Sequence, residues 1–288
     1  MWQDYHTTRN GRAHSVIGNV KVLHDLESVE LGNRRDILVY LPPSYESGDR
    51  RYPVFYLHDG QNLFDAETSF AGEWRVDNTM EALGQEGVEA IMVGIPNAGE
   101  ERVDEYSPFH MPKLGGGRGD LYLNFLIDQV KPLIDADFRT LLSPADTGIM
   151  GSSLGGLISL YGFFRHPETF GSAGVMSPSL WFADNAIYDF VHKAPFNAGR
   201  LYLDAGTREY GGDSIWSSRP FHSRRYYAGV RRMYRLLVKK GYRPRRDLLY
   251  VEEKKAGHDE EAWARRLPAA VRFLLNGSTT TERREKVE

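Results

Sequence analysis

Short apolar runs at long intervals are the main pattern of this chain. Beyond residue 50, six of them are apolar at nearly every position, which is typical of strands buried on both faces of a parallel sheet. These runs occupy residues 54–57, 90–93, 148–150, 173–176, 201–203 and 248–251. Because helical patterns separate most of them, the sequence predicts an α/β sheet with right-handed crossovers.

Two apolar segments near the N-terminus have a different character. Residues 19–23 and 36–41 form short strand patterns, and Pro42 stops the second, so we expect an antiparallel, hairpin-like start. Helical periodicity covers residues 121–130, 221–240 and about 260–275. Pro132 is expected to kink or end the first of these helices.

The same pattern indicates one domain with two short extensions. Residues 1–18 are interpreted as an N-terminal arm, because they are largely polar and aperiodic. Residues 19–276 carry all the predicted strands and helices as a single domain, with neither an internal repeat nor a linker-like composition. Residues 277–288 are polar and charged, and we interpret them as a C-terminal tail.

Composition and charge exclude several classes of protein. Of the 288 residues, 41% are hydrophobic and 26% are charged, as in packed globular proteins. Lys+Arg 36 against Asp+Glu 39 gives a formal net charge of −3, so the basic excess of a nucleic-acid-binding protein is missing. Because the chain has no cysteine, disulfides, thiolate nucleophiles and Cys-zinc sites are excluded.

Targeting and metal signals are also weak. No stretch has the pattern of a signal peptide or reaches the roughly 20 apolar residues of a membrane span, so we expect a cytoplasmic protein without membrane contact. His58 and Asp59 are adjacent but isolated from other possible metal ligands, and we interpret them as residues that orient a loop. We expect neither a metal nor another cofactor.

The clearest chemical signal is a G-x-S-x-G motif at residues 151–155. It follows the apolar run at 148–150 and precedes a helical pattern, so Ser153 lies at a strand–turn–helix junction typical of a nucleophile elbow. The alternative is a glycine-rich turn that contains serine by chance. A dinucleotide-binding loop is disfavoured, because Ser153 stands where its second glycine belongs.

A serine nucleophile needs a base, and in this type of fold the chain order is serine, acid, histidine. The histidines that follow the serine are His166, His192, His222 and His258. Only His258 follows the last predicted strand, at the carboxyl edge of the sheet, where catalytic groups collect. We therefore predict His258 as the base; a capping position beside Asp259 is the alternative.

Three carboxylates compete for the role of the acid that orients the base. Glu209 lies in the loop after residues 201–203 and is the preferred candidate. Asp204 is still within that strand, where a backbone or arginine partner is expected, and Asp213 lies beyond a Gly-Gly pair. The sequence leaves all three open.

Two backbone N–H groups are expected to stabilise the oxyanion of an acyl-transfer reaction. One belongs to Leu154, directly after the nucleophile. The other should come from the loop after residues 54–57, where Gly60 permits a close approach and either Gln61 or Gly60 is the donor.

Side chains on neighbouring strand-end loops are candidates for contact with the substrate. Arg102 and Tyr106 follow the strand at 90–93, and Trp181 follows the strand at 173–176. Trp74 is a further candidate, although aromatic residues are more often part of a core.

Several stretches together resemble the putative esterase family of α/β hydrolases. They are residues 52–62 (YPVFYLHDGQN), 151–156 (GSSLGG), 177–181 (SPSLW), 206–209 (GTRE) and 257–258 (GH). The family includes enterochelin (siderophore) esterases, feruloyl and acetyl-xylan esterase domains, S-formylglutathione hydrolases and mycolyltransferases of the antigen 85 type. The resemblance covers about residues 20–275.

By position, the resemblance implies Ser153 as nucleophile, His258 as base and Glu209 as acid. It also implies an α/β-hydrolase fold: a mostly parallel sheet with antiparallel N-terminal strands and helices on both faces. Leu154 and the loop at 60–61 would form the oxyanion hole.

The function expected from these residues is hydrolysis of a carboxylic ester through an acyl-enzyme on Ser153, without a metal. The substrate would be a small-molecule or carbohydrate-linked ester. One alternative is acyl transfer to a sugar or alcohol, and another is a non-catalytic binding protein. The sequence specifies neither the natural ester nor the oligomeric state.

Overall fold

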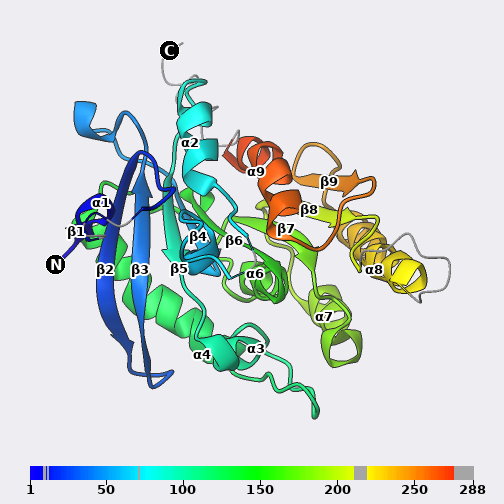
Figure 1. The fold of residues 1–288 in the computed structure, drawn as a ribbon. Helices are drawn as coiled ribbons and strands as arrows, with labels where there is room; N and C mark the ends of the chain where they lie inside the picture. Colours follow the sequence, from blue (N-terminus) through cyan, green and yellow to red (C-terminus); the bar gives the residue numbers. More distant parts are fainter. Residues whose placement is uncertain (9–10, 12, 71, 211–218, 276–288) are drawn as a thin grey trace.

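A computed structural model of the chain describes residues 1–8, 11, 13–70, 72–210 and 219–275 (Figure 1). Its sheet has nine strands in the order β1-β2-β3-β5-β4-β6-β7-β8-β9. The strands are β1 (Gln3–Asp4), β2 (Asn19–Ser28), β3 (Asn33–Leu41), β4 (Val54–His58), β5 (Ile91–Ile95), β6 (Thr147–Ser153), β7 (Ser172–Pro178), β8 (Arg200–Gly206) and β9 (Leu248–Glu253).

The described helices follow the expected alternation with the strands. The α-helices are α1 (Tyr5–Thr8), α2 (Val76–Gly84), α3 (Arg102–Glu105), α4 (Gly119–Asn124), α5 (Lys131–Asp137), α6 (Leu154–Arg165), α7 (Phe182–Lys193), α8 (Arg219–Lys240) and α9 (Glu260–Leu275). Short 3-10 helices are η1 (Tyr45–Ser47), η2 (Gly60–Asn62), η3 (Gly99–Glu101) and η5 (Pro144–Asp146), and η4 (Phe125–Val130) is a π-helix.

The sheet is parallel from β5 to β9 and antiparallel at its N-terminal edge. β2 and β3 form the predicted hairpin, with Asn19 opposite Leu41. All six apolar runs form the parallel strands, so the predicted fold class is confirmed. The carboxyl ends of β4 and β6 to β9 therefore meet at one edge of the sheet, which is where ligands bind in such folds.

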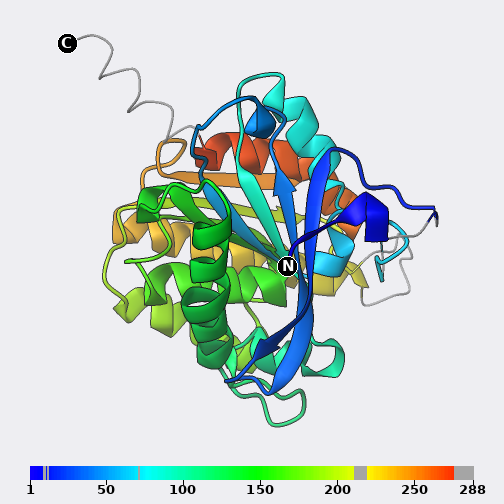
Figure 2. The same ribbon diagram turned by 90° about the vertical axis from the view of Figure 1, so that its left-hand side faces the viewer.

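Two apolar layers cover the two faces of the sheet, and Figures 1 and 2 show α2 and α9 on one face with α4 to α8 on the other. Alternate residues of β4 separate into the two layers. Val54 and Tyr56 pack with the α4–α8 layer, whereas Phe55 and Leu57 pack with the α2–α9 layer. Side chains on both faces are buried, which explains the uninterrupted apolar runs of the sequence.

Pro132 lies inside the first predicted helix, where the sequence predicted a kink or an end. Helical residues continue from Gly119 to Asp137 through α4, η4 and α5, so the helix does not end at Pro132. The wide π turns of η4 lie directly before the proline. A π turn shifts the backbone pairing by one residue, which accommodates a residue that has no N–H to donate.

The N-terminal residues contribute to the sheet. Gln3 and Asp4 pair with Val22 and Lys21 as strand β1, and the Tyr5 side chain is buried. The residues interpreted as a tail, 277–288, lie outside the described part of the chain. Of the helices that the structure describes, none has the length and apolar character needed to span a membrane.

Candidate active site

Ser153 ends β6 directly before α6, in a strained backbone conformation. Its φ of 58° and ψ of −119° lie in a region that residues other than glycine rarely adopt. A Cβ on Gly151 would lie 2.8 Å from a ring carbon of His58 and 2.9 Å from the carbonyl carbon of Gly155. The turn therefore requires glycine at position 151.

Ser153 and His258 line two clefts that meet at these two residues. The larger cleft, about 920 Å³, extends over the loops that follow β4 and β5 and includes Gln61 and Arg102. The smaller cleft, about 540 Å³, extends towards the loops that follow β7 and β8 and includes Trp181. An ester bound at Ser153 thus has room for a group on each side.

His258 is held by Glu209. Its Nδ1 lies 2.5 Å from Glu209 Oε2, and the Glu209 side chain is fully buried. The other carboxylate oxygen accepts hydrogen bonds from the N–H of Gly206, at 2.5 Å, and from the hydroxyl of Ser177, at 2.8 Å. Because a carboxylate only accepts, this network assigns the proton of His258 to Nδ1 and leaves Nε2 free to act as a base.

The hydroxyl of Ser153 has a partner that the sequence did not indicate. Its Oγ lies 3.1 Å from Oγ of Ser179, which follows β7. Within the described residues, no hydrogen bond joins Ser153 to His258. Catalytic hydrogen bonds are often long without substrate and tighten in the complex, so this geometry is compatible with a serine–histidine pair.

Of the two other candidate acids, the structure describes Asp204 but not Asp213. Asp204 Oδ1 accepts from the N–H of Ser177, at 2.8 Å, and Asp204 Oδ2 accepts from Nε of Arg266, at 2.9 Å. These are the backbone and arginine partners expected of a residue inside the strand. Asp213 lies outside the described residues.

The predicted oxyanion donors belong to the residue after Ser153 and to the loop that follows β4. Leu154 is the first residue of α6, so its N–H has no acceptor within the helix. Asp59 adopts a left-handed conformation, with φ of 57°, and turns the chain from β4 into η2. Gln61 lines the larger cleft, whereas Gly60 is buried against the backbone of Ile95.

A polar clamp fixes this loop from the side of β5. Nε and Nη2 of Arg102 donate to the two oxygens of Asp59 at 2.7 and 2.8 Å, and the Asn97 side chain donates to Asp59 at 2.7 Å. The Asn97 N–H also donates to Oε1 of Gln61 at 3.1 Å. Burial disfavours the charged form of Asp59, but Arg102 and Asn97 outweigh it and hold the pKa of Asp59 below its usual value.

The four candidate substrate contacts occupy different environments. Arg102 and Trp74 line the larger cleft, although Trp74 is almost fully buried. Trp181 lines the smaller cleft and is 41% exposed. Tyr106 does not reach either cleft: it is fully buried, and its hydroxyl accepts a hydrogen bond from the N–H of Asp59. A tyrosine expected at the substrate therefore supports, from the interior, the loop that follows β4.

Substitution of Gly60 tests whether this loop must pack closely against β5. A Cβ at Gly60 would lie 2.6 Å from the N of Pro96 and 2.7 Å from backbone atoms of Ile95. Since neither backbone can yield, Gly60→Ala should displace η2 and lower kcat for ester hydrolysis by about 100-fold. Gly48→Ala, at a glycine with open space around it and an extended φ of 174°, should leave kcat unchanged. Equal kcat values for the two variants would contradict this role of the loop.

His58 lies beneath the elbow and is isolated from water. Its Nδ1 is 2.7 Å from the hydroxyl of Tyr122, and its Nε2 has no partner among the described residues. Burial lowers the pKa of His58 to about 3 from the 6.5 of an exposed histidine. His58 therefore remains neutral in the folded protein at physiological pH.

The low pKa of His58 predicts a loss of stability in acid. Below about pH 6.5, His58 binds a proton in the unfolded chain but stays neutral in the folded protein. The free energy of unfolding should therefore fall by about 1.4 kcal/mol for each pH unit, until the pKa of the folded state is reached. His58→Asn removes this dependence and can still pair with Tyr122. The free energy of unfolding of the wild type, minus that of His58→Asn, should fall by about 2 to 3 kcal/mol between pH 6.5 and 4.5. A difference that does not vary with pH would contradict a buried neutral histidine.

The structure also bears on metal binding. Within residues 1–8, 11, 13–70, 72–210 and 219–275, no group of three or more His, Asp and Glu side chains is arranged to hold a metal ion. His58 and Asp59 point to different partners, Tyr122 and Arg102.

The sheet order and the strained serine between β6 and α6 define the class of protein as an α/β hydrolase. The family model described as putative esterase matches residues 28–274, and the chain belongs to this family.

Individual relatives agree with this membership. The chain is 32% identical over 193 residues to the uncharacterized protein YbbA of Bacillus subtilis, a match that covers 64% of this chain and 72% of YbbA. It is 30% identical over 142 residues to the siderophore triacetylfusarinine C esterase of Aspergillus fumigatus, a match that covers 47% of each protein. The enterobactin esterase FES from Shigella flexneri, solved in the presence of enterobactin, has a TM-score of 0.69 at 18% identity and covers 92% of this chain and 60% of its own. This last likeness concerns the fold.

Proposed function

We propose that this protein hydrolyses a carboxylic ester through an acyl-enzyme on Ser153. The observation that carries the proposal is the 2.5 Å pair of His258 Nδ1 and Glu209 Oε2 beside a strained serine that lines the same clefts. Membership of an esterase family and a relative named as a siderophore esterase support the same reaction.

In the first half-reaction, Ser153 Oγ attacks the ester carbonyl carbon while His258 Nε2 takes the hydroxyl proton. The negative charge that develops on the carbonyl oxygen is stabilised by the N–H groups of Leu154 and Gln61. The bond to the alcohol oxygen then breaks, and His258 gives its proton to the departing alcohol. Buried Glu209 stabilises the imidazolium that exists between these two transfers.

In the second half-reaction, water attacks the acyl carbon, and His258 takes one proton from that water. The bond to Ser153 Oγ breaks, the acid leaves, and His258 returns the proton to the serine.

The experiment is product analysis with p-nitrophenyl acetate and p-nitrophenyl butyrate, with and without added glycerol. We expect nitrophenol and an equal amount of free acid, with little glycerol ester. Mainly glycerol ester would contradict hydrolysis and favour acyl transfer to an alcohol. No release of nitrophenol above the rate in buffer would contradict both reactions for these esters.

A further inference from the structure

Ser177, near the end of β7, connects the candidate acid to a buried ion pair. The residue is fully buried and has a positive φ of 36°. Its N–H donates to Asp204 at 2.8 Å, and its carbonyl oxygen accepts from the hydroxyl of Tyr226 at 2.7 Å. Its Oγ lies 2.8 Å from Glu209 Oε1 and 3.0 Å from Nη2 of Arg266. Every polar atom of Ser177 is thus engaged.

The chemistry of these partners fixes the direction of the hydrogen bonds. A guanidinium group can only donate, so Ser177 Oγ must accept from Arg266. Among the described residues, the acceptor that the single hydroxyl proton of Ser177 then reaches is the Glu209 carboxylate. The resulting chain runs from Arg266 through Ser177 to Glu209, which His258 approaches from the other side.

We propose that Arg266 is a positioning residue of the active site, because it directs the Ser177 hydroxyl proton onto Glu209 and so keeps that carboxylate oriented as the acceptor for His258. The inference rests on the proposed function for its kinetic effect. Arg266 itself lines neither cleft that contains Ser153.

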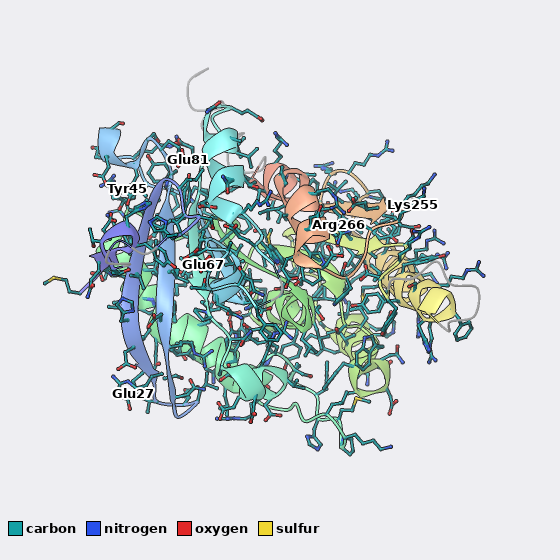
Figure 3. The ribbon with its side chains drawn as sticks, viewed as in Figure 1. Glu27, Tyr45, Glu67, Glu81, Lys255 and Arg266 are labelled. Atoms are coloured by element: carbon teal, nitrogen blue, oxygen red, sulfur yellow. The ribbon has the colours of Figure 1, made fainter. Side chains whose placement is uncertain are left out.

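Arg266 lies on α9, where Figure 3 labels it. If it served only to anchor this helix to the sheet, only part of its contacts would be explained. Its Nε donates to Asp204 at 2.9 Å and its Nη1 to Glu253 at 3.1 Å, and these bonds join α9 to β8 and β9. The third nitrogen is directed to Ser177 instead. The Arg266 side chain is 4% exposed. In such buried surroundings hydrogen bonds are strong, and a polar group left without its partner destabilises the fold.

Four variants and a matched control separate positioning from anchoring. The double variant Asp204→Asn/Arg266→Gln replaces the buried ion pair by two neutral amides and withdraws the donor from Ser177. Ser177→Ala removes the hydroxyl, and the triple variant combines both changes. Arg266→Lys keeps the charge beside Asp204 but has no second nitrogen for Ser177. The matched control is Glu86→Gln/Arg272→Gln, which neutralises an exposed ion pair between the α2–β5 loop and α9.

We expect the double variant, Ser177→Ala and Arg266→Lys each to lower kcat about tenfold or more, with KM within about twofold. If Arg266 acts through Ser177, the triple variant should match Ser177→Ala within about twofold, because the two losses are one interaction. A triple variant whose loss is the product of the two separate losses would overturn the proposal. So would wild-type kcat in Arg266→Lys, whose retained charge guards against a failure to fold.

A measurement without substrate keeps this inference separate from the proposed function. The Nδ1 proton of His258, bonded to Glu209, should give a far-downfield proton resonance in the folded protein. It should move in Arg266→Lys and in Ser177→Ala but not in the control. If the resonance does not move in these variants, the positioning role is overturned, even if the protein is an active esterase. If the resonance moves but the protein does not hydrolyse esters, only the proposed function is contradicted.

Discussion

Replacement of Ser153 by alanine is expected to lower kcat for ester hydrolysis by about 10⁶-fold. The hydroxyl is the atom that bonds to the acyl group, and no neighbouring group can replace it, because Ser179 Oγ lies 3.1 Å away without an imidazole partner among its described contacts. Residual catalysis over water should persist, since the N–H groups of Leu154 and Gln61 would still stabilise an oxyanion.

The control for this variant is Ser143→Ala. Ser143 is an exposed serine directly before η5 that lines neither cleft, and its hydroxyl accepts a hydrogen bond from the N–H of Ala145. It should retain wild-type kcat. Melting temperatures of both variants close to that of the wild type would show that the loss is chemical. A Ser153→Ala protein with even a tenth of wild-type kcat would contradict the proposed nucleophile.

Glu209→Gln is expected to lower kcat by about 10³- to 10⁴-fold with little effect on folding. The two donors from Gly206 and Ser177 would hold the amide oxygen of the new side chain at the Oε1 position. Its NH₂ group would then face Nδ1 of His258 and donate to it. The imidazole would carry its proton on Nε2, and a protonated Nε2 cannot accept the proton of Ser153.

Steady-state kinetics of Glu209→Gln beside Glu252→Gln tests this prediction. Glu252 is a partly exposed residue of β9 that pairs with Arg231 on α8, so its amide variant should retain wild-type kcat. Asp204→Asn provides the contrast within the buried network, and its main expected effect is on stability. If Asp204→Asn lost more of kcat than Glu209→Gln did, Asp204 would replace Glu209 as the candidate acid.

The sequence predicted the strands and the sheet of this molecule well, because both depend on local patterns of apolar residues. Strands buried on both faces must be apolar at nearly every position, and β4 is an example: its residues from Val54 to Leu57 all enter one core layer or the other. The glycines around Ser153 were likewise recognised from a local motif, although the atoms that a Cβ would meet there also include His58 of β4 and, for Gly156, Met176 and Pro178 of β7.

The supporting residues of the site depend on contacts between distant segments, which one sequence does not specify. Tyr106 is an aromatic residue on a strand-end loop, and only the packing of that loop beneath Asp59 places it in the interior. Ser177 is the last residue but one of β7, and Ser179 directly follows that strand. Their hydroxyls have different partners, Glu209 and Ser153, and Ser177 has a positive φ that a strand pattern does not indicate.

Arg266 was detectable in principle from helical periodicity. Beyond its first turn, the buried positions of α9 recur with helical spacing: Ala262, Trp263, Arg266, Leu267, Ala270, Val271, Leu274 and Leu275. A charge at an apolar position of such a helix requires a buried partner. The pattern could have identified Arg266 as unusual, but it could not have indicated that Asp204 and Ser177 are the partners.

Covalent labelling with a fluorophosphonate tests the central claim most directly, because the reagent reacts with a serine only when a base activates it. Wild type and His258→Ala would be incubated with the reagent, weighed intact by mass spectrometry and mapped by peptide. We expect one adduct on the wild type, on Ser153, and none on His258→Ala. No adduct on folded wild type, or equal labelling of Ser153 in both proteins, would contradict an active site built from Ser153 and His258.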